Sequence, residues 1–120
     1  MKDLENLKGR TKSFALRIIR LYGGLPKKTD AQIIGKQILR CGTSVGAQFR
    51  EGIRAKSKPD LVSKLEGSLQ ELEETQYWLE LLIESKIIKY ELLYPLYQET
   101  EELIAIFVTI VKKIKAIHNS

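Results

Sequence analysis

The chain has 120 residues, a length that fits one domain, and 43% of them are hydrophobic, which is enough for a packed core. The longest apolar run, Leu103–Val111, is about half of what a bilayer-spanning helix needs, so we expect no membrane partner. The single cysteine, Cys41, excludes an internal disulfide. With no signal-peptide pattern after Met1, this cysteine usage favours a cytoplasmic location.

The formal net charge of +5 is unevenly distributed along the chain. Residues 1–57 hold 13 Lys and Arg against four Asp and Glu, a charge of +9, whereas residues 58–120 hold seven against 11, a charge of −4. A basic half and an acidic half indicate either a polyanionic partner or association between unlike faces. The alternative is that both are ordinary solvated helix faces.

In the first segment, apolar residues recur every three or four positions, which predicts a helix over residues 2–22. Gly23 and Gly24 form a stop signal, and Pro26 cannot continue the helix. A short link is therefore expected before the next periodic segment.

The second helix is predicted over residues 30–56, with Thr29 or Asp30 as its N-terminal cap. The residues of its expected buried seam alternate in steps of four and three: Ile34, Ile38, Cys41, Val45, Gln48, Gly52 and Ala55. An amide and a glycine therefore lie among the predicted core positions of this helix.

A third helix is predicted over residues 58–84, with Ser57 as its cap and Pro59 in the first turn, where a missing N–H costs nothing. After a short turn, the fourth helix covers residues 90–118, and Pro95 either sets its start or kinks it.

Four long helices with short links predict an all-α, up-down-up-down antiparallel four-helix bundle in one domain, residues 1–120. Apolar residues beside the main seams favour a homo-oligomer.

No residue pattern for catalysis is present. His118 is the only histidine, so neither a metal site nor the Glu-x-x-His pairs of ferritin-like bundles can be assembled. Nucleotide-binding glycine motifs and nucleophile–base sets are also absent from the sequence. We therefore expect no enzyme, no cofactor and no metal.

A polar line runs beside the seam of the second helix. At about 100° per residue, its members fall within an arc of about 80°; they are Arg40, Ser44, Gln48 and Glu51. Buried polar groups need partners, and the third helix offers Ser68, Thr75 and Glu71. Arg40 can pair with either Glu71 or Glu51.

Gly42 and Gly46 lie four residues apart on the same helix, where each interior glycine costs about 1 kcal/mol relative to alanine. Small residues at this spacing allow two helix backbones to approach closely. We interpret them chiefly as determinants of helix packing. A direct binding site is the alternative.

The stretch "ILRCGTSVGAQFREGIRAKSKPDLVSKLEGSLQELEET" resembles the bacterial four-helix-bundle proteins encoded in intervening sequences of 23S ribosomal RNA genes. The residues that occupy the positions of the family's pattern are Arg40, Ser44, Val45, Gln48, Glu51, Gly52, Ser57, Ser68 and Glu71. Gln48 departs from it, because the family usually has Asn there. The resemblance implies a homopentamer without established enzymatic activity.

A more distant resemblance is to the accessory variability determinant of diversity-generating retroelements. That protein is also a basic pentamer, and it binds nucleic acid and a reverse transcriptase. The likeness is one of fold, so it supports function only by analogy.

The leading hypothesis is a non-enzymatic, oligomeric nucleic-acid-binding or accessory protein, with a reverse transcriptase as one implied partner. The candidate backbone-binding cations are Arg10, Arg17, Arg20, Lys27, Lys28, Arg50, Arg54 and Lys56. The alternative is a scaffold whose basic face docks an acidic partner or an acidic helix of a neighbouring subunit.

Overall fold

The computed structural model describes residues 2–119, and all of their side chains except those of Asp3, His118 and Asn119. It contains four helices and, within this described range, no strand, which confirms the all-α prediction. The helices are α1 (Lys2–Gly23), α2 (Thr29–Ile53), α3 (Lys58–Glu84) and α4 (Tyr90–Asn119). None of them, as far as they are described, is long and apolar enough to cross a membrane.

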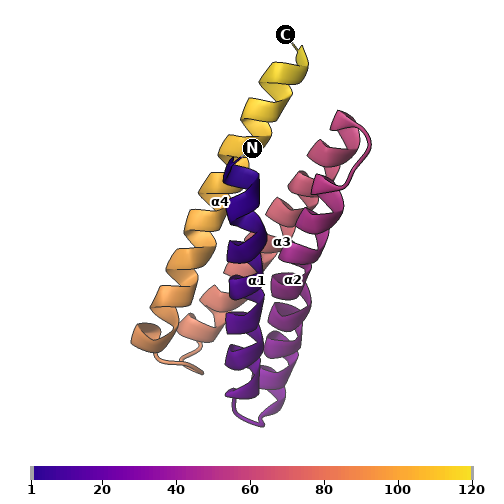
Figure 1. Cartoon of the computed structure of the whole chain (residues 1–120). Helices are drawn as coiled ribbons and strands as arrows, with labels where there is room; N and C mark the ends of the chain where they lie inside the picture. The colour runs from indigo at the N-terminus through magenta and orange to yellow at the C-terminus, as the bar shows by residue number, and fades with distance from the viewer. Residues whose placement is uncertain (1, 120) are drawn as a thin grey trace.

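Successive helices run in opposite directions and form an elongated bundle of 51 × 21 × 19 Å (Figure 1). The most extensive packing is between α2 and α3, while α1 packs on α2 and α4 packs on α3. The fourth side of the bundle is more open, because α1 and α4 approach each other only briefly. The chain thus forms two layers, α1 with α2 and α3 with α4.

The predicted signals at two helix ends are confirmed. The Ser57 hydroxyl accepts a hydrogen bond from the N–H of Asp60 at 3.2 Å, and Pro59 lies in the first turn of α3. At the end of α1, the N–H of Gly24 donates to the carbonyls of Arg20 and Leu21. Both ends follow local chemistry that is visible in the sequence.

The predicted bounds of the second helix are wrong at both ends. Lys28 is its N-cap residue and makes no side-chain cap, so neither Thr29 nor Asp30 has the predicted role. The helix ends at Ile53, three residues before the predicted end, because the last N–H groups bond three residues back and tighten the final turn. The three residues after Arg54 then reverse the chain into α3.

The link between α3 and α4 is a Schellman turn in which a lysine takes the place usual for glycine. Lys86 has a φ of 63°, in the left-handed region. Its N–H bonds to the carbonyl of Ile83, and that of Ile87 bonds to Leu82. Helix α4 begins at Tyr90 with Pro95 inside it, so Pro95 does not set its start.

Three phenylalanines, each fully buried, mark the centre of the core: Phe14, Phe49 and Phe107. The rings of Phe49 and Phe107 meet edge to face across the bundle, with centroids 5.9 Å apart. The predicted seam of the second helix left out Phe49 and included Gln48, which is only half-buried at the edge facing α3. At this height of the bundle, the buried position of α2 is therefore Phe49, one residue after the predicted Gln48. The line of core residues along α2 is displaced by that one residue.

The glycines of α2 allow close contact with α1. No described glycine has a positive φ, so none is needed for an unusual backbone conformation. A Cβ at Gly42 would lie 2.7 Å from Cγ1 of the buried Ile18, and one at Gly46 would lie 3.2 Å from the hydroxyl of Thr11. Their role in helix packing is therefore supported, and the partner is α1.

Candidate functional site

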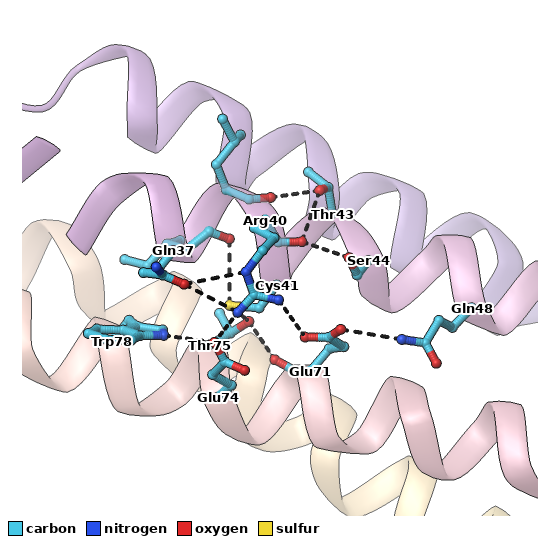
Figure 2. Close-up of polar contacts among 12 residues, drawn as sticks. Gln37, Arg40, Cys41, Thr43, Ser44, Gln48, Glu71, Glu74, Thr75 and Trp78 are labelled. Carbon is cyan, nitrogen blue, oxygen red and sulfur yellow. Dashed lines mark hydrogen bonds and ion pairs between the residues drawn. The ribbon is translucent and has the colours of Figure 1, made fainter. Parts of the chain in front are cut away.

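Arg40 is the centre of a polar network between α2 and α3 (Figure 2). Its guanidinium pairs with Glu74 and lies 3.7 Å from the carboxylate of Glu71. It also donates to the amide oxygen of Gln37, one turn earlier on α2, at 3.3 Å. The predicted Arg40–Glu71 pair is thus present, whereas Glu74 and Gln37 were not anticipated.

The two carboxylates extend the network along α3. Glu71 accepts a hydrogen bond from the amide of Gln48 at 3.3 Å, and Glu74 accepts one from the indole N–H of Trp78 at 3.1 Å. The side chain of Gln48 lies directly over Gly67, where any Cβ would collide with it. A glutamine in place of the family's usual asparagine can therefore reach α3 because glycine leaves room for it.

Other members of the predicted polar motif lie on the same interface but make separate contacts. Glu51 pairs with Lys64 of α3 at 2.9 Å, so the alternative Arg40–Glu51 pair is not formed. Ser44 donates to the carbonyl of Arg40 within its own helix at 2.7 Å. Gly52 allows close approach, since a Cβ there would lie 3.0 Å from that of Lys64.

Ser68 makes a fully buried link between the two helices. Its hydroxyl, fully inaccessible to solvent, donates to the carbonyl of Val45 at 2.8 Å. The hydroxyls of Thr11 and Thr100, by contrast, donate to carbonyls four residues earlier in their own helices, and that of Thr75 does so while also contacting α2. Ser68 therefore fixes the axial position of α3 against α2.

Cys41 lies beneath the network and is fully buried. The Thr75 hydroxyl lies 3.0 Å from its sulfur. Burial raises the pKa of the Cys41 thiol, and the Thr75 contact opposes this only in part. A neutral thiol without solvent access is a packing group rather than a nucleophile.

Burial also raises the pKa of Glu71, whose side chain is 17% exposed, while the charge of Arg40 opposes the shift. A carboxyl that holds its proton more tightly in the folded chain binds more protons there than when unfolded. The contribution of Glu71 to the free energy of unfolding therefore falls as pH rises from the ordinary value of 4.5 through the raised value.

We expect Glu71→Gln to weaken this pH dependence. The free energy of unfolding of the variant, minus that of the unchanged chain, should be larger at pH 7 than at pH 4, because an amide has no proton to lose. Urea unfolding at the two pH values measures the difference, with the exposed Glu73→Gln as the matched control. An equal effect of both variants at both pH values would contradict the burial argument.

The candidate cations divide into paired and unpaired residues. Arg10 donates to both oxygens of Glu99 at 2.8 Å and pairs with Glu102, so it joins α1 to α4. Its charge is already neutralised, which removes it from the predicted binding surface. The other seven candidates form no ion pair with any side chain that the structure describes: Arg17, Arg20, Lys27, Lys28, Arg50, Arg54 and Lys56.

The residues of the polar motif all lie along the α2–α3 interface, and the unpaired cations lie on α1, α2 and their links. Among the described residues, no group of three His, Cys, Asp or Glu could hold a metal ion. Each buried side-chain nitrogen or oxygen of that part of the chain has a hydrogen-bond partner. The network can therefore position helices, while the cations remain available for contacts outside the chain.

The family model of the 23S rRNA-intervening sequence protein matches residues 3–109, which include the whole polar network. The chain belongs to this family. A crystal structure of a protein of unknown function from the S23 ribosomal protein family of Bacteroides thetaiotaomicron is 39% identical, with a TM-score of 0.86. That match covers 93% of this chain and 99% of the other. No curated protein matches the chain.

Membership of the 23S rRNA-intervening sequence family confirms the resemblance inferred from the motif around Arg40 and Glu71. The more distant relation to retroelement accessory proteins stays a prediction, as do the oligomer and the nucleic-acid partner.

Proposed function

We propose that this chain is a non-enzymatic, cytoplasmic homo-oligomer that binds the sugar-phosphate backbone of RNA or DNA. The observation that carries the proposal is the separation of charge between the two layers of the bundle. The α1–α2 layer contains the basic half of the sequence and all seven unpaired candidate cations. The α3–α4 layer contains most of the carboxylates. A polyanion would be attracted to one layer and repelled by the other.

Association of copies is supported by apolar side chains that the described chain leaves uncovered. Nine large hydrophobic residues are more than a third exposed, among them Leu16 and Ile19 on α1 and Ile33 on α2. Contiguous exposed apolar surface is typical of interfaces, and Leu16 and Ile19 lie three residues apart on one side of α1. The resemblance to the family implies a pentamer, which would repeat the basic layer five times, and light scattering measures the mass.

Binding should be strongest at low salt and largely independent of sequence. We expect gel shifts with RNA and duplex DNA that weaken as salt rises, since each phosphate of a B-form duplex that a cation neutralises contributes about −0.9 to the log–log slope. Replacing Arg17 and Arg20 by glutamine should reduce that slope. The control replaces Lys112 and Lys113 of α4 by glutamine, which removes the same charge from the other layer without breaking an ion pair that the structure describes. If the unchanged chain binds neither nucleic acid at low salt, the proposal is wrong.

The second candidate is a scaffold in which the basic layer docks the acidic layer of another copy or of a partner. It is favoured by the same charge separation, with Arg17 opposite Glu73 as a candidate contact between copies. Arg17→Glu should then abolish assembly and Glu73→Arg should restore it in the double variant. Nucleic-acid binding predicts no such rescue. If the chain acts as an accessory to a reverse transcriptase, it should co-purify with that enzyme.

A further inference from the structure

Two pairs of unpaired cations lie at opposite ends of the same layer. Lys27 and Lys28 lie in the link before α2, and Arg50 and Arg54 lie at its C-terminal end. At about 1.5 Å per helical residue, the centres of the two pairs are about 37 Å apart along the helix axis. One uninterrupted helix, α2, lies between the two pairs and holds this separation.

The outward side of α2 between the two pairs carries two basic side chains, Lys36 and Arg40, and one exposed large apolar side chain, Ile33. Its outward positions recur in steps of three and four and hold Ile33, Lys36, Arg40, Thr43 and Ala47. Lys36 forms no ion pair with a described side chain, while Arg40 is held by α3. The carboxylates of α2 itself are Asp30, at the start of this line, and Glu51, which Lys64 neutralises; Glu71 and Glu74 of α3 pair with Arg40.

The spacing matches a double helix. One turn of a B-form duplex is about 34–36 Å long, so a strand that meets one cation pair returns to the same side near the other. A flexible single strand has no such fixed repeat. We propose that the partner is a duplex of at least about 11 base pairs, lying along α2 with its phosphates on both cation pairs. This inference rests on the proposed nucleic-acid function and names the form of the ligand.

The proposal predicts a step in affinity with duplex length. Fluorescence anisotropy at low salt should show at least about a tenfold gain between 8 and 12 base pairs, because only the longer duplex reaches both pairs. From 12 to 16 base pairs, only the smaller gain from additional binding positions should remain. Lys27→Gln with Lys28→Gln, or Arg50→Gln with Arg54→Gln, should each abolish the step.

The matched control is Lys86→Gln with Lys89→Gln, which removes two exposed charges at the same end as Lys27 but from the other layer. It should keep the step. Three results would overturn the duplex proposal while leaving nucleic-acid binding intact. The chain could bind duplexes of all lengths equally, the step could survive in both cation-pair variants, or a 12-nucleotide single strand could bind as tightly as the 12-base-pair duplex. Absence of any binding by the unchanged chain would overturn both.

Discussion

Gly42→Leu is expected to lower the free energy of unfolding by about 3 kcal/mol, at the upper end of the cost of overpacking. The reason is steric, because even a Cβ at this position would lie 2.7 Å from Cγ1 of the fully buried Ile18. The gain in helix propensity from replacing glycine, about 1 kcal/mol, is too small to offset that collision. Urea unfolding followed by circular dichroism measures the change.

The matched control is Gly9→Leu, because nothing lies within 4 Å of a Cβ at that position of α1. The same substitution there should raise the free energy of unfolding by up to about 1 kcal/mol. Shortening Ile18 to alanine beside Gly42→Leu should recover part of the loss by making room. If leucine at both glycines shifted stability in the same direction, close packing would not explain Gly42.

The helices could be predicted because their signals are local. The period of apolar residues, the cap at Ser57 and the stop at Gly24 each depend on a few neighbours in sequence. The end of α2 was overestimated because Ala55 and Lys56 continue the helical pattern. What stops the helix there is the need to reverse the chain into α3, which no local propensity expresses.

The polar network was predicted in its location but not in all of its partners. Arg40 was expected beside Glu71 or Glu51, and it meets Glu71 and Glu74, one turn apart on α3. The axial offset of two helices decides which carboxylates an arginine reaches. That offset is fixed by contacts such as Ser68 to Val45, which appear only once the helices are packed.

Arg10 shows the limit of reasoning from charge alone. Its two partners on α4, Glu99 and Glu102, lie 89 and 92 residues away in the sequence. On its own helix Arg10 has the same pattern as Arg17, which forms no ion pair with a described side chain. Only the packing of α1 against α4 separates a structural arginine from one that is available to a ligand.

Phe49→Ala is expected to cost about 4 kcal/mol, the larger of the two main effects, because it removes a fully buried ring from the centre of the core. The one-residue displacement of the α2 core line makes this test decisive. If Gln48 lay in the core as the alternation of four and three suggests, Gln48→Ala would be the costlier change. With Gln48 at the half-buried edge, its loss should cost only about 1 kcal/mol, that of one hydrogen bond to Glu71.

The edge-to-face contact with Phe107 adds a second, separable effect. A double-mutant cycle with Phe49→Leu and Phe107→Leu should give a coupling of about 1 kcal/mol, since leucine keeps most of the volume but not the ring geometry. Phe14 is equally buried but makes no ring contact with Phe49 in the described part of the chain, so it supplies the control pair. Equal coupling in both cycles would mean that volume alone holds α2 against α4. A larger coupling energy for the Phe49–Phe107 pair would show that the geometry of these two rings contributes to the diagonal contact between α2 and α4.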